Sequence, residues 1–117
     1  MRCLTPIDGD TLVRSVAKTG HLIVADTAQT AFGAGAEVVA IASGRAFSPL
    51  KSPPARLGLP HIPTLTSPAL ADLYYPRAMD IARLALDRLG IERALPPEPP
   101  TDRPWRDTPD PDFTGPY

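Results

Sequence analysis

The order of apolar and polar residues changes its period several times along the chain, and each period predicts a different element. Over residues 11–18 the larger apolar residues fall on one helical face, and Gly20 then favours a helix end because glycine tolerates a left-handed backbone. The next run, His21–Asp26 ("HLIVAD"), is apolar almost without interruption and has the length of a strand. Such a run is typical of a strand that is buried on both faces of a parallel sheet.

Similar signals continue toward the C-terminus. An alanine-rich stretch predicts a helix over about 35–46, which is apolar most of the way round and should pack tightly on the sheet. Residues Ala55–Leu59 ("ARLGL") are the only strand-like piece of the proline-punctuated segment 48–68. The clearest helix begins near Pro76 and ends at Gly90. At the other end of the chain, residues 2–8 begin with a strand-like fragment, which Pro6 interrupts by removing a backbone donor.

The alternation of helices and strands predicts an α/β fold with three layers, in which helices flank a mostly parallel sheet. We expect this domain to occupy residues 1–90. Eight of the 16 prolines lie in residues 96–117, so residues 91–117 are expected to form an extended, partly polyproline-like tail. Trp105, Phe113 and Tyr117 are aromatic anchors in this tail, for a partner or for the surface of the chain itself.

Composition narrows the class of protein without selecting a function. The 117 residues are enough for one domain, and 12 basic against 13 acidic residues give no electrostatic case for nucleic acid or an anionic membrane. No apolar run is long enough to cross a bilayer, and the first ten residues lack the pattern of a secretory signal. Cys3 is the only cysteine, which leaves no internal disulfide. We therefore expect a cytoplasmic location.

The glycine-rich stretch "GAGAEV" (Gly33–Val38) is similar to half of a dinucleotide-binding fingerprint. Such a site needs a glycine-rich turn at the tip of a strand, where phosphate can approach the N-terminus of a helix. In this chain Val38 stands in place of the third glycine, and six residues separate the turn from the predicted strand. The stretch therefore favours a helix start that packs closely on its neighbour.

The titratable residues define no recognisable active site. His21 and His61 have no metal-ligand spacing around them, so we expect structural or surface positions. Asp8 and Asp10 could form a carboxylate pair for acid–base chemistry, but their place before a helix favours capping. Cys3 has no histidine paired with it in the sequence, so the sequence gives only weak support for a nucleophile at this position.

Glu37 is the one carboxylate near the start of the predicted helix 35–46. Its carboxylate can interact favourably with the positive end of the helix dipole, or it can form a bond across an interface between subunits. We predict no catalytic, cofactor-binding or metal-binding residue. The candidate interface residues are Glu37, Trp105, Phe113 and Tyr117.

An ordered set of motifs resembles the C-terminal domain of transketolase-like proteins. The resemblance is strongest to beta subunits of the decarboxylating component of 2-oxo acid dehydrogenases, of the pyruvate and branched-chain types. "LTPID" (4–8) is similar to a strand end of the form L-x-P-x-D, and "SVAKTG" (15–20) is similar to the end of the following helix. "GAGAE" (33–37) is similar to a G-x-G-x-E helix start, and the resemblance extends to about residue 89.

The sequence also departs from this family's pattern. Asp26 and Thr27 stand where the family usually has a pair of glutamates. Alanine or Asp72 replaces the glutamate in a later segment that leads to the last helix. Any interface contact that the family's glutamates make is therefore not expected to be the same in this chain. The first strand and helix of the family's domain have no counterpart in the sequence.

The resemblance implies an assembly role in a thiamine-diphosphate-dependent enzyme that decarboxylates a 2-oxo acid. In that family the alpha subunit holds the diphosphate and its Mg²⁺, and the N-terminal domain of the beta subunit supplies the glutamate that activates the thiamine ring. The matching domain stabilises the subunit dimer and helps to dock the acyltransferase core. We therefore expect no cofactor and no activity in this chain alone.

The leading hypothesis is a C-terminal assembly domain, with the alpha subunit, the N-terminal part of the beta subunit and possibly the acyltransferase core as partners. An incomplete sheet would leave a strand edge exposed, so a homodimer or a larger species is expected. The alternative is a free-standing interaction module that binds its partner through the proline-rich aromatic tail. A small enzyme with its own site is a third possibility.

Overall fold

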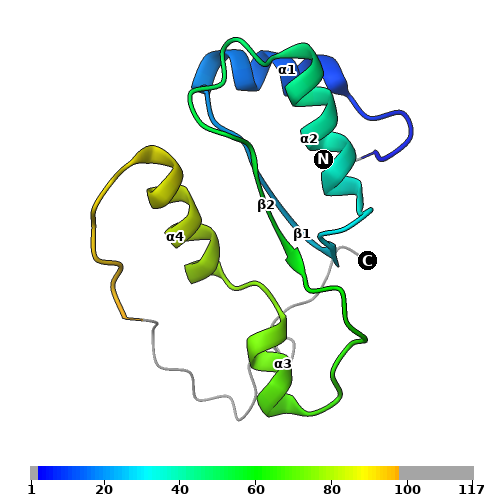
Figure 1. Ribbon diagram of the computed structural model, residues 1–117, viewed down its shortest axis with the longest axis vertical. Coiled ribbons are helices and arrows are strands. Elements are labelled where there is room, and N and C mark those ends of the chain that lie inside the picture. Colours follow the sequence, from blue (N-terminus) through cyan, green and yellow to red (C-terminus); the bar gives the residue numbers. More distant parts are fainter. Residues whose placement is uncertain (1–2, 98–117) are drawn as a thin grey trace, which may run out of the picture.

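The computed structural model describes residues 3–97, which contain four helices and a two-stranded parallel sheet (Figure 1). In chain order the elements are α1 (Gly9–Thr19), β1 (Ile23–Gln29), α2 (Ala34–Arg45), β2 (Ala55–Leu59), α3 (Pro68–Tyr74) and α4 (Ala78–Leu89).

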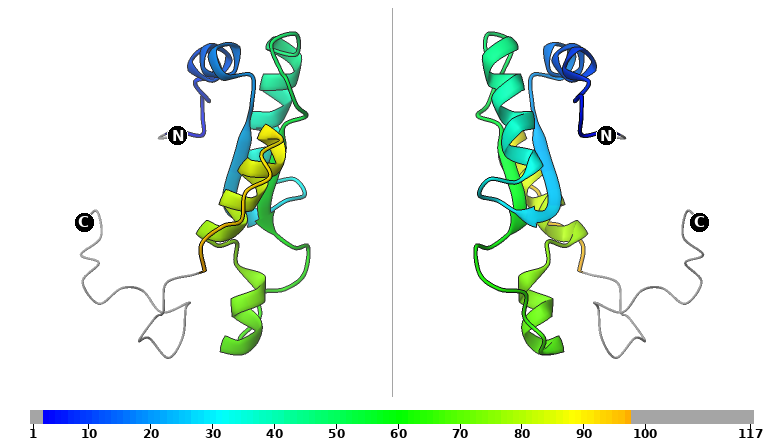
Figure 2. Two further views of the ribbon diagram at one scale, coloured as in Figure 1. Left: turned by 90° about the vertical axis from the view of Figure 1, so that its left-hand side faces the viewer. Right: turned by 90° about the vertical axis from the view of Figure 1, so that its right-hand side faces the viewer.

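The strand pair lies between helices on both of its faces. Figure 1 shows α2 on one side of the strands and α4 on the other, and the turned views of Figure 2 agree with this arrangement. Helix α2 contacts both strands, α4 contacts β1, and α1 packs on α2. The α/β fold with a parallel sheet flanked by helices is therefore confirmed.

Local signals define both ends of α1. The side chain of Asp8 accepts a hydrogen bond from the backbone N–H of Thr11 at 3.0 Å, which satisfies one of the free donors of the first turn. Gly20 ends the helix at a φ of 80°, and its N–H donates to the carbonyl oxygen of Val16. This left-handed conformation is strained for residues with a side chain, so the predicted glycine stop is confirmed.

The two strands pair in parallel, with Ile23 opposite Ala55 and Ala25 opposite Leu57. The register shifts between Ala25 and Gln29, where β1 contains an irregularity before Gln29 pairs with Leu59. The prediction for β2 over Ala55–Leu59 is confirmed residue for residue. Strand β1 begins two residues later and ends three residues later than the predicted run His21–Asp26, because pairing with β2 sets its limits.

The buried core is small and lies mainly between α1 and α2. Val16, Ala42 and Ala46 are almost completely buried, and partly buried apolar residues surround them: Leu12, Val13, Leu22 and Leu50. The other buried apolar residues of the described chain are Val38, Ala55, Leu59, Ala71 and Tyr74. Neither β1 nor α4 contributes a fully buried side chain. The strand that was expected to be buried on both faces is therefore only half covered.

The structure corrects further expectations. Residues 3–8 form no strand, because they have no backbone partner in the sheet. Helix α3 was not predicted within its proline-rich surroundings, although Pro68 stands at its first turn, where the missing N–H costs no helix bond. Helix α4 begins at Ala78 instead of Pro76, and Gly90 ends it as predicted.

None of the helices in residues 3–97 combines the length and apolar character needed to span a membrane.

Candidate assembly surface

The glycine-rich stretch before α2 brings that helix close to β1. Gly33 stands at the N-cap of α2, and a Cβ atom at Gly35 would lie 3.2 Å from Cγ1 of Val24. The glycines therefore allow the helix to pack closely on the strand. This agrees with the interpretation of the stretch as a closely packed helix start, which the sequence favoured over a dinucleotide-binding site.

The acidic residues at the start of α1 have structural roles. The hydrogen bond from the backbone N–H of Thr11 holds the pKa of the Asp8 carboxyl below its ordinary value of 3.8. Asp10 instead forms an ion pair with Arg45 at the end of α2, which links the two helices. Asp8 and Asp10 are therefore occupied as a cap and as an ion-pair partner, and the capping expectation is confirmed for Asp8.

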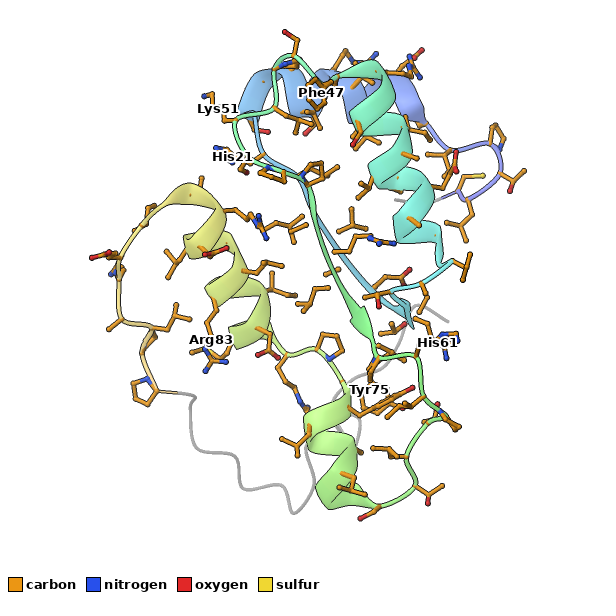
Figure 3. All side chains as sticks on the ribbon, viewed as in Figure 1. His21, Phe47, Lys51, His61, Tyr75 and Arg83 are labelled. Atoms are coloured by element: carbon orange, nitrogen blue, oxygen red, sulfur yellow. The ribbon has the colours of Figure 1, made fainter. Side chains whose placement is uncertain are left out.

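The two histidines lie far from each other. Nδ1 of His21 is 2.9 Å from Oγ of Ser52. This hydrogen bond links the segment just before β1 to the loop that precedes β2. His61 is exposed just after β2, and Figure 3 shows the two histidines near opposite ends of the strand pair. Within residues 3–97, no group of three or more histidine, cysteine or carboxylate side chains is arranged to hold a metal ion.

A groove runs along β1 on the side away from β2. Leu22–Asp26 form one wall, Cys3 and Leu4 form the opposite wall, and Leu12 and Val38 from the helices also line it. Its volume is about 820 Å³. We call this feature the β1 groove. Figure 2 shows the N-terminal segment beside the strand, connected to it through α1.

Helix α4 offers a second incompletely covered apolar face. Ile81 and Leu89 are exposed, and the other large apolar residues of the helix are only partly buried. An amphipathic helix normally buries its apolar stripe against a core. The described residues cover only part of this stripe, so the helix has apolar surface available for contact.

Sequence reasoning missed the most exposed apolar side chains. Phe32, between β1 and α2, is 98% exposed and has a φ of 60°, while Leu73 on α3 is 87% exposed. Phe47, just after α2, is also largely exposed. They belong to separate elements, so they do not follow one helical or strand period. An aromatic residue beside a glycine-rich turn, as in "AFGAG" (31–35), was the available signal for Phe32.

Of the predicted interface residues, the structure describes only Glu37. It lies exposed in the first turn of α2, where a carboxylate interacts favourably with the helix dipole. Trp105, Phe113 and Tyr117 lie outside the described residues.

Comparison with known families identifies the domain. The sequence model of the family "Transketolase, C-terminal domain" matches residues 1–81 of the chain. This match covers most of the chain and agrees with the α/β architecture. The chain therefore belongs to the transketolase C-terminal domain family.

Individual relatives are beta subunits of larger enzymes. The chain is 39% identical over 85 residues to the acetoin:2,6-dichlorophenolindophenol oxidoreductase subunit beta of Cupriavidus necator, which covers 73% of this chain and 25% of that protein. It is 32% identical over 93 residues to the mitochondrial pyruvate dehydrogenase E1 component subunit beta of Saccharomyces cerevisiae, covering 79% of this chain and 25% of that protein. The chain thus spans about a quarter of the length of these curated relatives.

Proposed function

We propose that this chain is the C-terminal assembly domain of a thiamine-diphosphate-dependent dehydrogenase beta subunit. The complete enzyme would decarboxylate a 2-oxo acid and transfer its acyl group. The family membership and the similarity to pyruvate dehydrogenase beta subunits support this proposal. Another relative bears the name of an acetoin oxidoreductase, so acetoin is the second substrate class to test.

The observation that carries the assembly role is the uncovered apolar surface. Helix α4 has a broad apolar stripe and strand β1 begins with an apolar run, yet neither has a fully buried residue in the described chain. Apolar area removed from water stabilises an interface by about 25 cal/mol per Å² before the costs of association. A partner that covers these elements would therefore supply the burial that residues 3–97 do not provide.

The partners in this proposal are an alpha subunit, the N-terminal part of the beta subunit and possibly the acyltransferase core. Glu37 lies exposed at the start of α2, so it is available for a contact between subunits. We retain Trp105, Phe113 and Tyr117 as proposed contacts of the tail over residues 91–117, and residues 1–90 as the domain. A second copy of the chain and a cytoplasmic location also remain proposals.

The cofactor belongs to other parts of the enzyme in this proposal. Thiamine diphosphate is held through a divalent metal, for which carboxylate and amide oxygens are suitable ligands. Within residues 3–97, no three acidic, histidine or cysteine side chains are grouped to hold a metal ion. The proposal places the cofactor and its Mg²⁺ on the other parts of the enzyme because the resemblance implies it. We assign no step of the reaction to residues of this chain.

Native mass spectrometry of a gently purified, tagged chain from its own host tests the proposal. We expect recovery with larger chains, in a complex that contains thiamine diphosphate. Recovery of the chain alone or only with itself would contradict the proposal. A calorimetric titration of the isolated chain with thiamine diphosphate and Mg²⁺ is the companion measurement, and tight binding there would also contradict it.

A further inference from the structure

A second groove lies between α4 and the segment that follows it. Beyond the helix end at Gly90, residues 91–97 turn back beside α4 (Figure 1). The groove has a volume of about 710 Å³, and side chains from both the helix and this segment line it. We call this feature the α4 groove. Its lining includes four apolar side chains: Met79, Leu86, Ile91 and Leu95.

The lining of the α4 groove suits a large aromatic ring. Methionine and leucine offer an apolar surface, and methionine sulfur makes favourable contacts with aromatic rings. Arg83 and Arg93 also line the groove, and Figure 3 shows Arg83 on the side of α4 that faces residues 91–97. A guanidinium is attracted to the face of an aromatic ring, most strongly to that of tryptophan. The apolar and cationic groups therefore favour the same occupant.

The chain carries such a ring within reach of the groove. The described residues end at Pro97, which is itself part of the lining, and Trp105 follows eight positions later. Eight residues in extended form span up to about 26 Å, whereas the 12 residues of α4 rise about 18 Å. The tether is therefore long enough for Trp105 to reach any part of the groove.

We propose that the α4 groove binds residues 102–107 ("DRPWRD") of the same chain, with the indole of Trp105 against Met79 and Leu86. The inference concerns the chain by itself, so it does not rest on the proposed function. Ile81 and Leu89 do not line the groove, so this contact leaves them available to a partner subunit.

The charges of the groove and of the segment are compatible with this contact. The groove lining contains two charges of each sign: Arg83, Arg93, Asp87 and Glu92. The proposed segment also contains two charges of each sign: Arg103, Arg106, Asp102 and Asp107. Neither side has an excess of one sign, so docking brings no net repulsion. Exposed ion pairs between them would orient the segment more than they stabilise it.

The tether favours this occupant over a second copy of the chain. A short linker gives the attached segment an effective concentration in the millimolar range. A separate chain at micromolar concentration would need a contact about a thousandfold tighter to compete. Phe113 lies twice as far from Pro97 along the chain as Trp105, which lowers its effective concentration about threefold. Trp105 is therefore the aromatic residue that the groove meets most often.

Fluorescence of the only tryptophan in the chain tests the proposal directly. A synthetic peptide of residues 98–117 defines how strongly acrylamide quenches an exposed Trp105. In the full chain we expect quenching at least about threefold weaker than in the peptide, because the tether keeps the contact closed most of the time. The protection should not change over a wide range of chain concentration, since the contact lies within one molecule.

Two matched serine variants test the position of the contact. Ile91 lines the groove and is 48% exposed, whereas Leu89 lies outside the lining and is 51% exposed. Ile91→Ser should lower the ratio of docked to undocked chain about fivefold, because it removes apolar contact area. Leu89→Ser should preserve the protection of Trp105. Circular dichroism verifies that both variants fold.

A photocrosslink locates the ring even if one of the serine variants unfolds. Benzoylphenylalanine in place of Trp105 should crosslink within the same chain to residues 79–97. The same group in place of Phe47 is the control, because Phe47 is exposed and lies far from Arg83 (Figure 3). No crosslink from position 47 to residues 79–97 is expected.

Each contrary outcome overturns the proposal. Quenching of Trp105 in the full chain as strong as in the peptide would show that the ring does not dock. Protection that appears only at high chain concentration would assign the groove to a second copy. Equal loss of protection in Leu89→Ser and Ile91→Ser, or a crosslink outside residues 79–97, would place the ring elsewhere. Concentration-independent protection that only Ile91→Ser reduces, together with the expected crosslink, would support the proposal.

Discussion

Gly33 lies so close to the backbone of Gln29 that a Cβ atom at position 33 would be 2.5 Å from the carbonyl oxygen of Gln29. The backbone of Gly33 has ordinary extended angles, so lack of space explains the glycine at this position. The turn from β1 into α2 therefore depends on the absence of a side chain.

Gly33→Ala should destabilise the chain by about 1–3 kcal/mol, because the turn must move to relieve the overlap with a backbone atom. Gly44→Ala is the matched control, since a Cβ at Gly44 meets no atom within 4 Å. It lies in α2, where alanine is the better helix former, so a gain of about 0.5 kcal/mol is expected. Urea denaturation followed by circular dichroism measures both, and equal effects would contradict the steric explanation.

Because of the cap at Asp8, the stability of the folded chain should depend on pH in the acidic range. Its pKa is lower in the folded chain than its ordinary value of 3.8, because the carboxylate accepts from the N–H of Thr11. A lowered pKa means that this stabilisation is complete above 3.8 and is lost as the pH falls through the folded value. Asp8→Asn keeps a capping oxygen but does not titrate. As the pH falls over this acidic range, the unfolding midpoint of the Asp8→Asn variant should therefore decrease less than the unfolding midpoint of the unsubstituted chain.

Phe32 should respond differently in the isolated chain and in a complex. Its φ of 60° is unfavourable for a bulky residue, by about 1–2 kcal/mol, and its side chain is almost fully exposed. Phe32→Gly should leave the isolated chain as stable as before or more so. If the side chain contacts a partner, the same change should weaken the complex. Phe47→Ser, at another exposed aromatic residue, shows whether any loss is specific to Phe32.

Deletion of residues 96–117 distinguishes an assembly domain from a module that acts through its tail. All of the helices and strands in the described chain lie before Pro96, so we expect the deleted form to retain its circular dichroism spectrum. An assembly domain should keep its larger partners in a pull-down. Complete loss of the partner by a folded variant would favour the alternative module, with binding through Trp105, Phe113 and Tyr117.

Local signals in the sequence predicted the ends of elements best. The Asp8 cap, the Gly20 stop and the Gly90 stop act within a few residues, and each is present in the structure. Strand β2 was also predicted because prolines mark both of its ends. Such signals do not depend on the rest of the fold.

The failures concern contacts between distant parts of the chain. The apolar run around Val24 predicted burial on both faces, but the described residues bury β1 only in part. Residues 3–8 have the pattern of a strand without a backbone partner. Exposure of Phe32 follows from a loop conformation that no period in the sequence encodes. The candidate surface was therefore much less predictable than the elements that carry it.

The parallel pairing of β1 and β2 also affects how the chain forms. Ile23 can pair with Ala55 only after all of α2 and the following loop have been synthesised. Until then the edge of β1 that pairs with β2 has no partner strand, whereas α1 can form from neighbouring residues alone. Pairing between residues that are distant in the sequence slows folding, and it prolongs the exposure of apolar surface and unpaired strand edges. The crossover through α2 therefore leaves this edge of β1 open during synthesis, in the interval between completion of β1 and arrival of β2.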